Sequence, residues 1–223
     1  MPKTILILGD SWGVPADPND KMTYKDQADR DHLQNLLLRD GHEVINASAN
    51  GGSNIEAMER ANEILGDRSV NWMIWLFTNP IRDHYRWDRS NLLIEKNQHL
   101  ENLALKEFRK LRNRFECRSM VIGGQCALSE NSQRYLESIN VDEIIVDWRN
   151  ECLGKKRTPY TPYVGQHDFI EKSDDPHDWK MNELNLIQRN LVLMERSKMF
   201  PDNCHPGAEA HRTLYKKIKK HFR

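Results

Sequence analysis

Short apolar runs alternate with longer amphipathic segments along most of this chain. The five apolar runs are Thr4 to Leu8, Glu43 to Ala47, Val70 to Phe77, Ser119 to Gly123 and Glu143 to Trp148. Short runs of this kind are typical of strands that are buried on both faces, and strands that alternate with helices form parallel sheets. We therefore predict an α/β fold built on a five-stranded parallel sheet.

Apolar residues at helical spacing indicate the helices that connect these strands. The predicted helices cover residues 31–39, 54–65, about 91–115 and about 207–222. In the first of them Leu33, Leu36 and Leu37 share one face, as expected of a helix that packs on a sheet.

The chain of 223 residues has the length of one domain, so we predict a single domain over 1–223. Two segments lack clear periodicity and are rich in polar residues and proline. We predict that they form irregular insertions, near 14–30 and near 151–179.

Charge and cysteine content limit the kinds of partner and the cellular compartment that we expect for the protein. The 33 basic and 33 acidic residues cancel, which argues against nucleic acid or an anionic membrane as the partner. The apolar run at Ile5–Leu8 is too short for an export signal or a membrane span, so we expect a cytoplasmic protein. The four cysteines, at 117, 126, 152 and 204, form no CxxC pair and are expected to be free thiols.

Small and polar residues follow each predicted strand. The four blocks that attract attention are GDS at 9–11, NASANGGSN at 46–54, TNP at 78–80 and DNCH at 202–205. In an open parallel sheet, ligands bind beyond the carboxyl ends of the strands. The first three blocks are therefore expected to meet at one edge of the sheet.

The residue types in these blocks are those that acyl transfer needs. A serine hydroxyl requires a base within hydrogen-bond reach and a third group that orients the base, and Ser11, His205 and Asp202 supply these types. The oxyanion needs hydrogen-bond donors, which the N–H of Ser11, a glycine N–H at 51 or 52 and the Asn79 side chain can provide.

The four blocks, in this order and over nearly the whole chain, resemble the SGNH (GDSL-type) hydrolases. The resemblance implies a flavodoxin-like three-layer sandwich, the SGNH hydrolase fold, and a serine esterase mechanism without a cofactor or metal. It also implies that Ser11 is the nucleophile, His205 the base and Asp202 the residue that orients it. Ser11, Gly51 and Asn79 would then form the oxyanion hole.

Three positions depart from the family pattern. The third block usually reads GxND, whereas residues 77–80 are FTNP, so the glycine and the acid are both replaced and the setting of the asparagine is altered. The leucine that follows GDS is replaced by Trp12, which we expect either to stack on a sugar ring or to close the core. Asp10 is expected to have a structural role at the nucleophile turn.

Other polar residues are weaker candidates. Gly52 and Arg82 are possible substrate contacts, although Arg82 and Asp83 would also suit a surface ion pair. The acids and histidines between His167 and Asp178 offer metal-ligand types but match no ligand spacing, so we predict a solvated loop there.

These observations favour a serine hydrolase that removes a small acyl group, such as acetyl, from a carbohydrate or another polar carrier. A thioesterase or a lysophospholipase with the same fold stays open. The altered third block favours another alternative, a binding or assembly module whose catalytic set has decayed. A two-metal phosphoesterase is disfavoured because the chain lacks a Gly-Asn-His run.

Overall fold

The computed structural model describes residues 1–10, 12–15, 31–78, 80, 83, 94–124, 127–153 and 206–222. Its strands are β1 (Thr4–Leu8), β2 (Glu43–Asn46), β3 (Trp72–Phe77), β4 (Arg118–Gly123) and β5 (Glu143–Ile145). All of them pair in parallel, in the order β2-β1-β3-β4-β5. This is the flavodoxin-like strand order, so the predicted fold class is confirmed.

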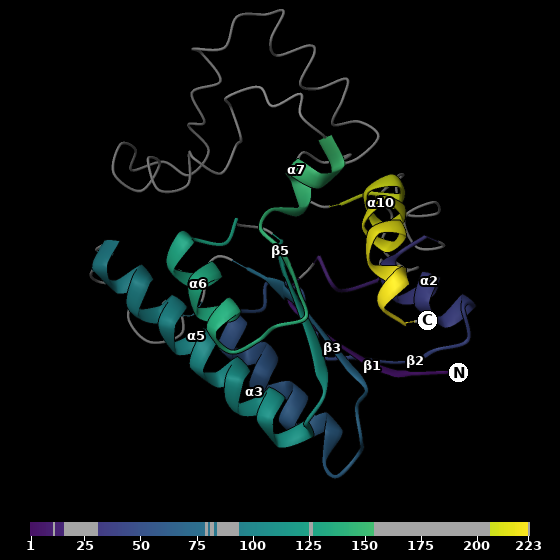
Figure 1. The fold of residues 1–223 in the computed structure, drawn as a ribbon, viewed down its shortest axis with the longest axis horizontal. Helices are drawn as coiled ribbons and strands as arrows, with labels where there is room; N and C mark the ends of the chain where they lie inside the picture. Colours follow the sequence, from purple (N-terminus) through teal and green to yellow (C-terminus); the bar gives the residue numbers. More distant parts are fainter. Residues whose placement is uncertain are drawn as a thin grey trace, which may run out of the picture.

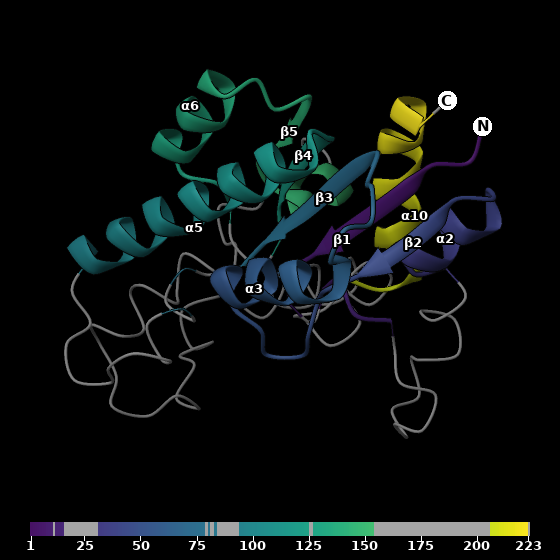
Figure 2. The ribbon, with the colours of Figure 1, turned by 90° about the horizontal axis from the view of Figure 1, so that it is seen from below.

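Helices cover both faces of the sheet (Figure 1). They are α2 (Leu33–Arg39), α3 (Asn54–Leu65), α5 (Ile94–Phe115), α6 (Glu130–Ser138), α7 (Trp148–Leu153) and α10 (Ala208–Ile218), which continues as the 3-10 helix η2 (Lys219–Phe222). One core cluster joins the sheet to α3, α5 and α6, and the other joins it to α2 and α10. Figure 2 shows the sheet between these two helix layers.

The central strand β3 explains why the sequence reads as continuous apolar runs. All six of its residues are buried, because β1 and β4 flank it and helices cover both of its faces. Trp75 faces α5 and stacks on Phe108, with ring centroids 4.8 Å apart. Trp72 faces the opposite layer and packs edge-on against Phe222. Side chains therefore alternate between the two cores, although none of them meets water.

Two helices differ from the sequence prediction. Helix α6 was not expected, because its sequence ENSQRYLES buries only Ser132 and Leu136 and so carries a weak apolar pattern. The last apolar run was wrong in its extent: β5 ends at Ile145, and Trp148 begins α7. The predicted insertion near 151–179 therefore begins inside a helix, and its remainder lies outside the described residues, as do residues 16–30 of the first insertion.

Polar contacts tie α2 to α10 on the second layer. Asp31, just before α2, accepts hydrogen bonds from Arg39 and Arg212, and these two guanidinium groups lower the pKa of its carboxyl. Tyr215 donates to Asp40 at the other end of α2. Within the described part of the chain, no helix is long and apolar enough to cross a bilayer.

Candidate active site

The carboxyl ends of β1, β2 and β3 meet at one edge of the sheet, as the strand pairing requires. Ile7 pairs with Asn46, and Leu8 pairs with Trp75. Beyond the strands the contact continues, because Ala49 N donates to Gly9 O at 3.2 Å. The segments that follow these strands therefore lie side by side, as the sequence predicts.

The structure describes the residues that surround the predicted site and some, but not all, of the predicted site residues. Five of the predicted site residues lie outside the described residues, namely Ser11, Asn79, Arg82, Asp202 and His205. Trp12, Gly51 and Gly52 are described. The catalytic roles of all these residues stay predictions, and the geometry that supports them is that of the surrounding residues.

Asp10 holds the turn that follows β1. Its carboxyl is 1% exposed, Oδ1 accepts from the N–H of Trp12 at 3.0 Å, and Oδ2 accepts from the hydroxyl of Thr78 at 2.7 Å. The turn is closed further by Gly13 N, which donates to Asp10 O at 3.0 Å. A carboxyl bound on both oxygens to the protein frame fits the structural role predicted for Asp10.

Asn46 fastens the same turn to the end of β2. Its Nδ2 donates to Gly13 O at 2.7 Å and to Gln34 Oε1 at 2.7 Å, while its Oδ1 accepts from Ser48 N at 2.9 Å. A Cβ atom on Gly13 would lie 2.2 Å from Ser48 Oγ and 2.8 Å from Ser48 Cβ. Glycine is therefore required at position 13 by close approach of the two segments.

Replacement of Gly13 by alanine is expected to lower the free energy of unfolding by about 1–3 kcal/mol, the usual cost of overpacking. Urea denaturation measures this change. The double variant Gly13→Ala/Ser48→Gly removes the two closest atoms and leaves only Leu76 Cδ1, 3.3 Å from the added Cβ, so most of the lost stability is expected to return relative to Ser48→Gly alone. Equal stability of Gly13→Ala and the wild type would contradict the close packing.

The two glycines after β2, both candidate oxyanion donors, differ in burial and hydrogen bonding. Gly51 has φ +67°, a backbone conformation that favours glycine, and it is exposed. Gly52 is buried, and its N–H donates to Ala49 O at 3.0 Å within the turn. Because the N–H of Gly52 already has a partner, the geometry favours Gly51 as the donor to a substrate.

Trp12 closes the core beside the nucleophile turn. Its side chain is 1% exposed and packs edge-on against Trp148, with ring centroids 5.4 Å apart. Such burial favours the core role over the alternative of a platform for a sugar ring.

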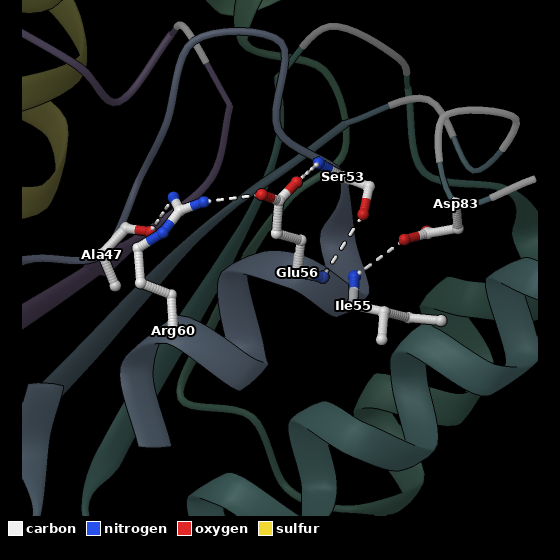
Figure 3. A network of polar contacts seen from close by, with 6 residues as sticks. All are labelled: Ala47, Ser53, Ile55, Glu56, Arg60 and Asp83. Carbon is white, nitrogen blue, oxygen red and sulfur yellow. Dashed lines mark hydrogen bonds and ion pairs between the residues drawn. The ribbon is translucent and has the colours of Figure 1, made fainter. Parts of the chain in front are cut away.

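Asp83 is a buried capping group at the start of α3, as Figure 3 shows. Its Oδ1 accepts from Ile55 N at 2.9 Å, and burial raises the pKa of its carboxyl. Ser53 and Glu56 form a capping box at the same helix end, with Ser53 Oγ accepting from Glu56 N at 3.3 Å. A surface ion pair is therefore wrong for Asp83, which is fully buried.

Two buried histidines, one at the start of α2 and one in α10, lie in contact. His32 is the N-cap of α2, where its Nδ1 accepts from Gln34 N at 3.2 Å, and His211 Nδ1 accepts from Leu33 N at 3.3 Å. The ring centroids are 4.3 Å apart. Burial lowers the pKa of His32 to about 4, and burial together with His32 lowers the pKa of His211 well below its usual value. Both rings are therefore neutral near pH 7.

No described group of three or more histidine, cysteine, aspartate or glutamate side chains is arranged to hold a metal ion. The acids and histidines between His167 and Asp178 lie outside the described residues. Cys117 and Cys152 are free thiols whose pKa values burial raises to about 11 and about 12. These two thiols are unsuited to nucleophilic chemistry near pH 7.

Sequence comparison and structure comparison give different results. No protein-family model matches the sequence, and no curated protein matches it. The structure is similar to LAE5, an α/β hydrolase enzyme from the metagenome of Lake Arreo, Spain, with a TM-score of 0.54 and 12% identity over 98% of this chain and 94% of that chain.

Two further solved structures share the architecture. The lipase/acylhydrolase from Enterococcus faecalis has a TM-score of 0.52 and 12% identity, over 98% of this chain and 96% of that one. A two-domain esterase active on acetylated mannans has a TM-score of 0.51 and 13% identity, over 99% of this chain but 48% of its own. At such identities the similarity establishes the fold, and it agrees with the SGNH hydrolase fold expected from the sequence.

Proposed function

We propose that this chain, which has the fold of the SGNH (GDSL-type) hydrolases, is a serine esterase of that family. The observation that carries the proposal is the convergence of three predicted blocks at one edge of the sheet. Asp10 binds Thr78, and Gly9 binds Ala49, so the GDS turn touches the segments that lead to Asn79 and to the glycine turn. An acyl-transfer site needs its nucleophile and its oxyanion donors close together, around one reacting carbonyl.

Each proposed catalytic residue has a defined role, and Ser11 has two. Ser11 attacks the ester carbonyl, and His205 takes its proton and later returns it to the leaving alcohol. Asp202 orients the imidazole of His205. The N–H groups of Ser11 and Gly51 and the side chain of Asn79 bind the oxyanion, where preorganised donors stabilise the charge that develops in the transition state.

The proposed substrate is a small acyl ester, such as an acetyl ester, of a carbohydrate or another polar carrier. Polar residues in the segments near 14–30 and 151–179 support a polar carrier. The structural similarity to an esterase active on acetylated mannans supports the same choice. Thioester and lysophospholipid substrates are the alternatives within this mechanism.

A second candidate function is a binding or assembly module without catalysis. The observation that favours it is the third block, in which Phe77 and Pro80 replace the family's glycine and acid. Phe77 is 1% exposed and packs in the core against Trp75, so this position contributes to folding.

Labelling with a fluorophosphonate, followed by peptide mapping, tests the proposed function. An esterase is expected to be modified stoichiometrically at Ser11 and to hydrolyse p-nitrophenyl acetate or acetylated sugars. A panel of acetylated sugars, longer acyl esters, thioesters and lysophospholipids then identifies the substrate class. An unlabelled Ser11, with no member of the panel hydrolysed, would favour the binding module.

Replacement of Asn79 by alanine is expected to lower kcat roughly a hundredfold or more, the usual loss for one oxyanion donor. The change in KM is expected to be small, because the donor acts on charge that is present only in the transition state. Steady-state kinetics measures both constants. An unaltered kcat would remove Asn79 from the oxyanion hole.

A further inference from the structure

Thr78, the residue after β3, is fully buried, and each of its polar groups contacts another buried side chain. Its N–H donates to Asn54 Oδ1 at 2.9 Å, and its C=O accepts from Asn54 Nδ2 at 2.9 Å. Its hydroxyl donates to Asp10 Oδ2 at 2.7 Å. One residue therefore joins the end of β3 to the first residue of α3 and to the turn after β1.

These contacts involve the residues that directly precede two of the proposed catalytic residues in the sequence. Asp10 precedes Ser11, and Thr78 precedes Asn79. The carboxyl of Asp10 also accepts from the N–H of Trp12, so it binds the backbone just after Ser11 as well. The hydroxyl of Thr78 is thus connected through one carboxyl to the turn that carries the nucleophile.

The chain on the other side of Asn79 is fastened to the same helix turn. Asp83 Oδ1 accepts from the N–H of Ile55 at 2.9 Å, a contact drawn in Figure 3. The first two residues of α3, Asn54 and Ile55, therefore bind positions that precede and follow Asn79 in the sequence. The start of α3 therefore binds Thr78 of the third block and also Asp83, four residues after Asn79.

We propose that Thr78 and Asn54 are positioning residues of the esterase site, which hold the nucleophile turn and the Asn79 segment at a set separation. This inference rests on the proposed function. Thr78 acts through Asp10, and Asn54 acts through the backbone of Thr78. Neither side chain reaches a substrate, because both are fully buried.

The physical reason lies in the cost of an unpaired buried group. Without the hydroxyl of Thr78, Oδ2 of Asp10 loses this hydrogen bond, and we expect the turn to shift as the buried carboxyl adjusts to the loss. Displacement of a reacting group by about 1 Å lowers rates roughly a hundredfold. The loss is expected in kcat, because the affected distance is that between the nucleophile and the oxyanion donor.

Three variants test the hydroxyl of Thr78. Thr78→Val keeps the side-chain shape and is expected to lower kcat roughly tenfold to a hundredfold with little change in KM. Thr78→Ser keeps the hydroxyl and is expected to restore most of kcat. Ser119→Ala is the control, since Ser119 is a buried hydroxyl residue that pairs with Met73 near the start of β3, away from the site. Its kcat is expected to equal that of the wild type.

A double-mutant cycle tests whether Thr78 acts through Asp10. Asp10→Asn alters the same hydrogen bond from the other side and is expected to lower kcat. In the double variant Thr78→Val/Asp10→Asn, the loss is expected to be smaller than the product of the two single losses, because both changes act on the same hydrogen bond. If Thr78→Val does not fold, as judged by thermal melting, Asp10→Asn and Asn54→Asp carry the kinetic test.

The outcomes separate this inference from the proposed function. A wild type that is labelled at Ser11 and active, with Thr78→Val equally active or with Thr78→Ser as impaired as Thr78→Val, would overturn the positioning role alone. Multiplied losses in the cycle would show that Thr78 does not act through Asp10 and would also overturn it. A wild type that is neither labelled nor active would overturn the esterase proposal and the positioning role with it.

Discussion

Replacement of Ser11 by alanine is expected to lower kcat by about a million-fold, the scale seen when one member of a catalytic triad is lost. The nucleophile, base and orienting acid act as a unit, so the remaining two residues contribute little without the hydroxyl. A residual rate above that in water is still expected, because the oxyanion donors and substrate binding remain. Single-turnover kinetics with an activated ester, together with fluorophosphonate labelling, measures the effect.

Ser48 provides the matched control for this experiment. It lies at the same edge of the sheet, and its buried hydroxyl has no hydrogen-bond partner among the described residues. Ser48→Ala removes only this unbonded hydroxyl and is therefore expected to keep kcat within about threefold of the wild type, since only interactions that strengthen in the transition state contribute to kcat. Activity retained in Ser11→Ala but lost in Ser48→Ala would contradict the assignment of the nucleophile.

The buried pair His32 and His211 is expected to make the protein sensitive to acid. In the unfolded chain an imidazole takes up a proton near pH 6.5, whereas burial lowers the pKa of His32 to about 4 in the fold. Stability is therefore fully present above about pH 6.5 and falls as the pH drops towards 4. The lowered pKa of His32 alone corresponds to a loss of about 3 kcal/mol over this interval, and the lowered pKa of His211 adds to it.

Among the other groups with shifted pKa values, His42 acts in the same direction, because burial lowers the pKa of its partly buried ring as well. The carboxyl groups act outside this interval or against it. Asp31 and Asp142 have lowered pKa values, so the stability that they contribute is lost only as the pH falls below about 3.8. The pKa of Asp83 is raised by burial, so this carboxyl favours the folded state as the pH falls and offsets part of the histidine effect. Between pH 6.5 and 4.5, protonation of the two buried imidazoles is still expected to dominate the dependence of the unfolding free energy on pH.

Urea denaturation at pH 7, 6, 5 and 4.5 measures this dependence. His32→Asn keeps a side-chain acceptor suited to a helix N-cap and removes the titrating ring. This variant is expected to show a flatter dependence of the unfolding free energy on pH. His99→Asn, on the exposed side of α5, is the control and should follow the wild type. Parallel curves for His32→Asn and the wild type would exclude His32 as the source.

The local pattern of the sequence was sufficient to predict the sheet and most of its helices. Runs such as Thr4–Leu8 are apolar because both faces of the sheet are covered, and that requirement acts on every residue of the strand. Helix α6 escaped prediction because it buries few apolar residues, and α7 escaped because its first residue, Trp148, extends an apolar run.

The place of the candidate site could be predicted because its residues come directly after strands. The blocks at 9–11, 46–54 and 78–80 stand after successive strands, and parallel pairing brings such ends to one edge. The choice of Gly51 over Gly52 came from the family resemblance and stays a prediction; the turn geometry supports it, because Ala49 O already accepts from the N–H of Gly52.

The sequence by itself determined the strand pattern, the edge at which polar residues gather and the residue types available for acyl transfer, because these follow from local periodicity and chain order. Only the tertiary structure decided that Thr78 binds Asp10, 68 positions away, and that the backbone N–H of Leu33 binds His211 of α10, 178 positions away. Hydrogen bonds between such distant residues depend on how the layers pack, and no short stretch of sequence carries that information.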